Sequence, residues 1–146
     1  MKTISLLTPA DLKSAFTIEQ ASHAFPWSEK ILLSNQGERY LNLKLEVNGE
    51  LAGFAITQTV LDEATLFNIA IHPKFQRQGL GRELLATLVE QLKTKDIMTL
   101  WLEVRESNHN AIQLYHSIGF NETDIRCHYY PTKTGREDAI IMALII

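Results

Sequence analysis

The chain has 146 residues, of which 45% are hydrophobic, and a formal net charge of −3. This length and hydrophobic content suffice for one well-buried core, so we expect residues 1–146 to form a single domain. The negative charge argues against direct nucleic-acid binding, because phosphate contacts need a clustered basic face. The only cysteine, Cys127, excludes an intramolecular disulfide and a four-thiolate metal site.

No segment resembles a membrane span or an export signal. The longest apolar run, Ala139 to Ile146, is far shorter than the ~20 residues that a spanning helix needs. The N-terminus lacks the apolar stretch and the small-residue cleavage site of a signal peptide. We therefore expect a cytoplasmic protein that does not contact a membrane.

The first part of the chain predicts a strand followed by two helices. Thr3–Leu7 is expected to form the strand, and Pro9 and Asp11 begin a pattern with apolar residues at helical spacing. A second, short helix is expected to begin at Ser28.

An antiparallel meander is predicted next. Tyr40–Val47 alternates as a half-buried strand, Asn48-Gly49 is a strong hairpin turn, and Leu51–Leu61 returns as the partner strand. Asp62-Glu63 is expected to make another tight turn into a strand over Ala64–His72.

The second half alternates helices and strands. Gly81–Thr94 carries leucines at helical spacing, Ile97–Val104 is the next strand, and Ser107 is expected to cap a helix that ends at Gly119. The last two strands are expected at Phe120–Tyr129 and Asp138–Ile145. The order β-α-α-β-β-β-α-β-α-β-β indicates an α/β fold with a mixed, mostly antiparallel sheet flanked by helices.

A glycine-rich segment, Gln76 to Arg82, separates the strand ending at His72 from the following helix. Gly79 and Gly81 lack Cβ atoms, so backbone N–H groups can come close to an anion at the positive end of a helix dipole. Arg77 and Arg82 add positive charge. The segment indicates either a pyrophosphate-binding loop or only a glycine-rich connection into a helix.

This segment matches neither common nucleotide fingerprint, because Arg82-Glu83 follows Gly81 and Leu84 replaces the third glycine of a dinucleotide site. It does resemble the Gln/Arg-x-x-Gly-x-Gly/Ala signature of the GCN5-related N-acetyltransferases, in which backbone amides wrap the pyrophosphate of coenzyme A. The resemblance implies the GNAT fold and acetyl-CoA as co-substrate. It places acetyl-CoA at Arg77, Gln78, Gly79, Leu80, Gly81 and Arg82.

Further segments narrow the resemblance. Residues 24–28, 66–71, 101–105 and 108–119 together resemble the RimI group of bacterial ribosomal-protein-alanine N-acetyltransferases. That resemblance implies acetyl transfer to the α-amine of an N-terminal alanine on a small-subunit ribosomal protein. Arg126–Pro131 is similar to the paired-tyrosine segment of protein N-terminal acetyltransferases, which implies an acceptor site formed by Trp27, Tyr129 and Tyr130.

Glu103 is the candidate general base. On its strand Leu102 and Val104 share one face, so Glu103 points to the other. The residues alone favour a structural glutamate paired with Arg105 or Arg39, whereas the resemblance puts Glu103 at the family's general-base position.

Tyr115 is the candidate general acid. The family pattern Asn-x-x-Ala-x-x-Leu-Tyr-x-x-x-Gly-Phe reads here from Asn108 to Phe120, which implies that Tyr115 protonates the departing thiolate and that Asn108 lies at the cofactor. A half-buried aromatic on an amphipathic helix is the alternative.

The backbone of Ile69, Ala70 and Ile71 is the expected contact of pantetheine, if a bulge leaves these groups unpaired. Three ordinary strand residues in a core are the alternative. The histidines show no recognisable metal spacing, and Cys127 is either small packing or an acetyl carrier. Lysine or small-amine acetylation, and a non-catalytic coenzyme A-binding module, remain alternatives for the function.

Overall fold

The computed structural model describes all 146 residues and contains one seven-stranded sheet. The strands are β1 (Lys2–Leu6), β2 (Leu43–Val47), β3 (Glu50–Val60), β4 (Glu63–Ile71), β5 (Thr99–Arg105), β6 (Asn121–Pro131) and β7 (Arg136–Ile145). The helices are α1 (Leu12–Ser22), α2 (Glu29–Ser34), α3 (Leu80–Thr94) and α4 (His109–Ile118), with 3₁₀ turns at Pro9–Asp11 and Pro73–Phe75. None of them has both the length and the apolarity that a membrane-crossing helix requires.

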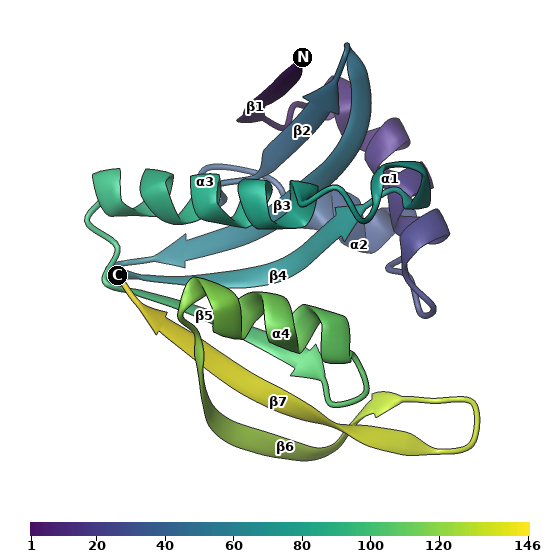
Figure 1. The fold of residues 1–146 in the computed structure, drawn as a ribbon, viewed down its shortest axis with the longest axis vertical. Coiled ribbons are helices and arrows are strands. Elements are labelled where there is room, and N and C mark those ends of the chain that lie inside the picture. Colours follow the sequence, from purple (N-terminus) through teal and green to yellow (C-terminus); the bar gives the residue numbers. More distant parts are fainter.

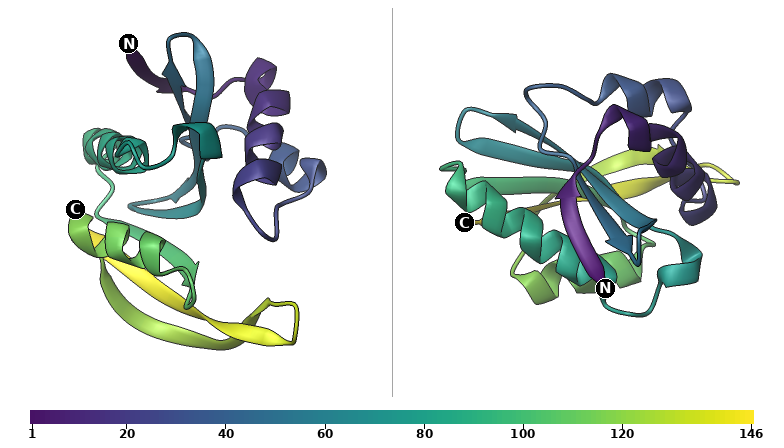
Figure 2. Two further views of the ribbon diagram at one scale, coloured as in Figure 1. Left: turned by 45° about the vertical axis from the view of Figure 1, so that its right-hand side comes forward. Right: turned by 90° about the horizontal axis from the view of Figure 1, so that it is seen from above.

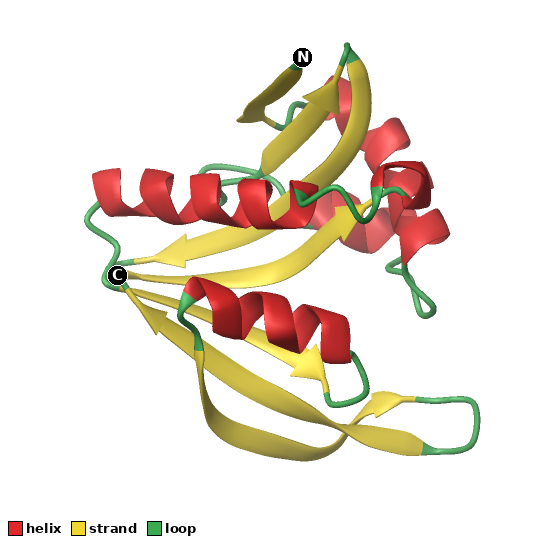
Figure 3. Cartoon of the chain, viewed as in Figure 1, coloured by secondary structure: helices red, strands yellow, loops and turns green.

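The sheet order is β1-β2-β3-β4-β5-β7-β6, and only β4 and β5 pair in parallel. Figure 1 shows α3 and α4 in front of the sheet, and the view from above in Figure 2 places α1 and α2 on its other face. The coloured cartoon in Figure 3 shows the same three layers, helix, sheet and helix. The expected mixed, mostly antiparallel α/β sheet is confirmed.

Two apolar clusters hold the layers together. The larger one has 21 buried residues and includes the leucine stripe of α3, in which Leu84, Leu85, Leu88 and Leu92 are fully buried. The smaller one packs α1 and α2 through Ala15, Ile18 and Leu32 against Phe54 and Ile56 of β3. Burial of apolar side chains at helical spacing explains why the periodic patterns of the sequence became these helices.

Strand β4 opens away from β5 at its C-terminal end. Pairing between them covers only Glu63–Leu66 with Thr99–Leu102, and the two ribbons diverge beyond it (Figure 1). The register of β3 with β4 shifts between Ile56 and Thr57, where Asn68 and Leu66 are the partners, so Phe67 is an extra residue in β4. Strand β4 therefore contains a bulge at Phe67, whereas Ile69–Ile71 stay paired with β3 and are unpaired only on the edge toward β5.

The bulge exchanges the faces of β4. Ala64 and Leu66 belong to the cluster under α3, whereas Ala70 belongs to the cluster under α1, although strict alternation would keep all three on one face. Ile69 and Ile71 accordingly pack toward α3. Asn68, paired with Ile56, shares the α1 face.

Most element boundaries agree with the sequence to within one or two residues, but the strand predicted over Tyr40–Val47 begins only at Leu43. The Asn42 side chain is the reason. Its Oδ1 accepts from the Thr57 N–H at 3.1 Å, and its Nδ2 donates to the Asn35 carbonyl at 2.9 Å, so a side chain takes the place of regular strand pairing.

The expectation that Ser107 caps α4 is wrong. Asn108 is the N-cap, and its Oδ1 accepts from the Ala111 N–H at 3.3 Å. Ser107 instead donates to Glu137 at 3.0 Å. Both residue types are good caps, so long-range pairing with β7 decided between two neighbours. The turn before β4 is also one residue earlier than expected, at Leu61-Asp62.

Candidate active site

A cavity of about 860 Å³ opens where β4 and β5 separate. Its lining comes from α1 and the segment after it, the C-terminal half of β4, the glycine loop with the start of α3, the end of β5, α4, and Tyr130 of β6. The carboxyl ends of two parallel strands that separate are a common place for a ligand, because unpaired backbone groups and helix N-termini meet there.

The glycine loop forms one end of this cavity. Gly79 has φ +75°, a left-handed conformation that glycine adopts without strain, and α3 begins at the next residue. At Gly81 an added Cβ would lie 3.8 Å from both Ile71 and Leu114, so this position stands between β4 and α4. Absence of a side chain there keeps the space open beside the α3 N-terminus, which suits a bound pyrophosphate.

Other loop residues differ in their placement. Arg77 lines the cavity with φ +64°, and Leu80 is buried beneath it. Arg82 also lines it, but its guanidinium donates to Ser117 and so ties α3 to α4. Gln78 is exposed and lies outside the lining.

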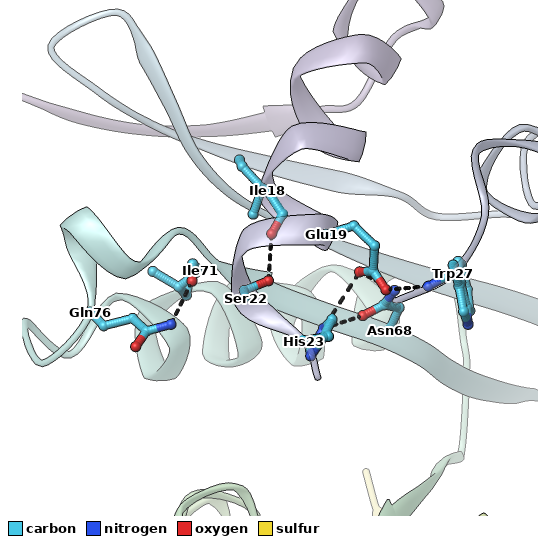
Figure 4. Close-up of polar contacts among 8 residues, drawn as sticks. All are labelled: Ile18, Glu19, Ser22, His23, Trp27, Asn68, Ile71 and Gln76. Atoms are coloured by element: carbon cyan, nitrogen blue, oxygen red, sulfur yellow. Dashed lines mark hydrogen bonds and ion pairs between the residues drawn. The ribbon is translucent and has the colours of Figure 1, made fainter. Parts of the chain in front are cut away.

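Ile69, Ala70 and Ile71 line the cavity on the side where β4 has lost its partner β5. The Ile71 carbonyl accepts from the Gln76 side-chain amide at 2.8 Å, which anchors the glycine loop to the end of β4 (Figure 4). The open edge of β4 and the glycine loop are therefore held together by a hydrogen bond.

Glu103 and Tyr115 line the cavity from two different elements, β5 and α4. Glu103 projects from β5 away from the core residues Leu102 and Val104, as its alternation predicts, with its side chain 29% exposed. Its ionic partner is Arg126 of β6, at 3.5 Å, rather than Arg105 or Arg39. Tyr115 on α4 is buried, and burial, followed by the neighbouring Tyr130, raises the pKa of its phenol above the ordinary value.

Tyr130 of β6 lines the cavity together with Glu103 and Tyr115. Burial, then the charge of Glu103 and the neighbouring Tyr129, raises the pKa of Tyr130 to about 12. Asn108 lines the cavity beside them, whereas Tyr129 lies outside the lining and packs edge-on against Tyr130 at 5.0 Å.

The segment after α1 closes the remaining side through Phe25 and Trp27. Arg105 lies 4.5 Å from the ring centroids of both Phe25 and Tyr130. It also donates to the Pro131 carbonyl at 2.7 Å and pairs with Glu137 at 3.3 Å. One guanidinium therefore links the α1–α2 segment to the paired-tyrosine strand.

A buried polar cluster stands beneath Trp27. The Glu19 carboxylate accepts from the backbone N–H of Trp27 at 2.9 Å and from the side-chain amide of Asn68 at 2.8 Å (Figure 4). His23 Nε2 lies 3.0 Å from Asn68 Oδ1 and 3.5 Å from Glu19 Oε1. All four residues line the cavity.

Residues 6–120 match the model of the acetyltransferase (GNAT) family. The chain belongs to this family. Acetyltransferases of the GNAT family take their acetyl group from acetyl-CoA, and the loop, open strand and bulge form the part of the cavity that suits it.

The GNAT chain is 65% identical over 146 residues to the [ribosomal protein bS18]-alanine N-acetyltransferase of Escherichia coli K12, covering 100% of this chain and 99% of that one. It is 58% identical over 144 residues to the enzyme of the same name from Haemophilus influenzae, with 98% of both chains covered. The crystal structure of the E. coli ribosomal-protein-S18-alanine N-acetyltransferase superposes with a TM-score of 0.98 over 100% of this chain and 94% of that chain, at 65% identity.

Several cavity residues of this GNAT chain were missed by the sequence reasoning. Glu19 occupies a core-facing position of an amphipathic helix, and a histidine follows one turn later, which was a readable signal for a buried pair. Asn68 gave no such signal, because the bulge at Phe67 determines on which face of β4 its side chain lies. Cys127 is exposed and outside the cavity, which argues against a role as acetyl carrier.

Proposed function

We propose that this protein transfers the acetyl group of acetyl-CoA to the α-amine of the N-terminal alanine of ribosomal protein bS18. The observation that carries the proposal is the 65% identity, across the whole chain, to an enzyme of that name. Such a reaction belongs to the cytoplasm, where ribosomal proteins are made, and the chain acts as one domain because a single sheet supports every part of the site.

At the cofactor end, backbone donors at Gly79, Leu80 and Gly81 hold the pyrophosphate at the positive end of α3. Arg77 adds positive charge, and Arg82 and Gln78 contribute from the loop through their backbone. The open edge of β4 at Ile69–Ile71 receives pantetheine as an added strand, and an N–H there stabilises the oxyanion.

Two side chains move protons at the reacting atoms. Glu103 accepts a proton from the acceptor nitrogen, directly or through water, and Arg126 holds its carboxylate in place. Tyr115 donates its phenolic proton to the departing thiolate. Because burial raises the pKa of Tyr115, the phenol is protonated at neutral pH, as a general acid must be.

An α-amine is the acceptor that places the least demand on Glu103. Its ordinary pKa of ~7.8 leaves an appreciable neutral fraction at cytoplasmic pH, whereas a lysine near ~10.4 is about 0.1% neutral. Trp27 and Tyr130 line the same cavity as Glu103, and Tyr129 packs against Tyr130 from outside the lining. This setting favours a small N-terminal residue such as alanine.

The test is acetylation of a peptide with the N-terminal sequence of bS18, mapped by tandem mass spectrometry. We expect one acetyl group, on the α-amine, and no reaction when that amine is blocked. Acetylation of lysines, or an equal rate with the α-amine blocked, would establish the lysine or small-amine activity instead. Binding of acetyl-CoA without any turnover would indicate a coenzyme A-binding module.

A further inference from the structure

Glu19 is a buried carboxylate to which the proposed reaction gives no role. It is 1% exposed, and its polar partners are the backbone N–H of Trp27, the side-chain amide of Asn68 and His23. A buried carboxylate is costly unless it is paired and hydrogen-bonded. Here the pairing extends to a histidine, His23, whose side chain is 33% exposed and lines the cavity.

The hydrogen bonds determine which nitrogen of His23 carries a proton. An ionised carboxylate only accepts, so the Asn68 amide turns its NH₂ to Glu19 and its Oδ1 to His23 (Figure 4). An amide oxygen also only accepts, so His23 Nε2 is the protonated nitrogen. In the neutral ring the lone pair is then on Nδ1, for which the protein supplies no hydrogen-bond partner.

The proton balance of the reaction requires more than one acceptor. An α-ammonium must lose one proton before its nitrogen can attack and a second as the amide forms. With an ordinary pKa of ~7.8, the free acceptor is mostly ammonium at pH 7. Glu103 accounts for one of these protons. The other leaves either to solvent before the amine binds or to a second base in the site that exchanges with water.

We propose that His23 is that second base, an inference that rests on the proposed function. His23 Nδ1 takes the first proton: an N–H bond of the ammonium breaks, an Nδ1–H bond forms, and the positive charge passes to the imidazolium. Glu19, 3.5 Å away, stabilises that charge, and the exposed part of the ring releases the proton to solvent. Glu19 and Asn68 are positioning residues, and Glu103 takes the second proton during attack.

Only Glu19 among the charged groups contacts His23. From the other elements, the charged and titratable groups facing the same cavity are Arg77 and Arg82 at α3, Glu103 and Arg105 on β5, Tyr115 on α4 and Tyr130 on β6. Glu103 is already paired with Arg126, and Arg105 with Glu137. The buried Glu19 is thus the carboxylate available to an imidazolium at this position.

The test is the pH profile of kcat/KM for the alanine-first bS18 peptide between pH 6 and 9, in wild type and His23→Gln. The acid limb of the wild type should lie at lower pH than that of the variant, whose limb should lie near the ordinary α-amine value of ~7.8. At pH 6.8 about 9% of such an amine is neutral, so the loss in the variant should be up to roughly tenfold there and should vanish above about pH 8.5. Affinity for acetyl-CoA should stay within about twofold, because the cofactor contacts are elsewhere.

A second variant separates chemistry from folding. His23→Ala leaves a space open to the cavity, and added imidazole should restore the low-pH rate. His116→Gln is the matched control, since His116 lies outside the cavity and bonds Glu122 and the Phe120 carbonyl. It should keep the wild-type profile.

Parallel pH profiles for wild type and His23→Gln, or no rescue of His23→Ala by imidazole, would overturn the role of His23 as a base. Either result would leave the proposed function standing. A wild-type protein that fails to acetylate the peptide at every pH would overturn the proposed function, and the acceptor that His23 serves would fall with it.

Discussion

The guanidinium of Arg105 lies 4.5 Å from the centroid of the Tyr130 ring, and it covers the Phe25 ring at the same distance. These three residues come from β5, β6 and the segment after α1, and all of them line the cavity. Arg105 therefore links two parts of the cavity lining, although it is not a proton-transfer group in the proposed reaction.

Arg105→Leu should loosen both parts of the lining. Each cation–π contact is worth about 0.5–1 kcal/mol, so we expect the KM for the bS18 peptide to rise roughly tenfold. The peptide KM of Arg105→Lys should lie between those of the wild type and Arg105→Leu, because an ammonium lacks the planar surface that stacks on two rings. Steady-state kinetics with each substrate varied in turn would check this. An unchanged peptide KM in Arg105→Leu would show that the stack does not shape the acceptor site.

Glu103→Gln and Tyr115→Phe should each lower kcat by roughly 10²-fold or more while acetyl-CoA affinity is kept. Both changes preserve shape, and the Phe at position 115 still packs on Phe120, whose ring centroid lies 5.6 Å away. Single-turnover measurements and calorimetry report the two quantities. Cys127→Ala, at an exposed position outside the cavity, is the active control. Wild-type turnover in both variants would show that Glu103 and Tyr115 do not transfer protons in the reaction.

Gly81→Val should weaken acetyl-CoA binding more than Arg77→Ala. A Cβ at position 81 meets Ile71 and Leu114 only at 3.8 Å, an ordinary contact, so the variant should fold, but its added methyl groups occupy the space between β4 and α4. Arg77 contributes charge from an exposed loop, where backbone donors carry most of the contacts. Calorimetric titration with acetyl-CoA decides the order. Equal affinity of Gly81→Val and wild type would place the pyrophosphate elsewhere.

Alkaline pH should destabilise the fold through the two cavity tyrosines. Burial raises the folded-state pKa of Tyr115, and burial with the charge of Glu103 raises that of Tyr130 to about 12. Below pH ~10, the ordinary tyrosine pKa, both folded and unfolded chains hold these protons and stability is complete. Above it the unfolded chain releases them first, so stability falls as pH rises.

The Tyr115→Phe variant isolates this effect. Thermal melts at pH 8, 10 and 11 should show a smaller decrease of Tm in the variant than in wild type, because one of the two linked titrations is gone. Identical decreases would mean that burial of Tyr115 is not linked to alkaline unfolding.

Local patterns in the sequence determined most of the fold. The leucine stripe of α3, the Asn48-Gly49 turn and the start of α2 beside Ser28 all appear where they were predicted, since each depends on neighbours within a few residues. The glycine loop was also readable, because Gly79 takes a left-handed conformation that glycine adopts without strain.

Only the tertiary structure decided which side chains meet in the cavity. The Phe67 bulge reverses the faces of β4, so the Asn68 side chain points to Glu19 and not to α3. The alternation of residues in the sequence does not predict that reversal. Glu103 likewise pairs with Arg126, which lies on β6 and comes near only through the β5-β7-β6 order of the sheet. Such contacts join residues far apart in the chain, and their partners follow from strand order and register rather than from spacing.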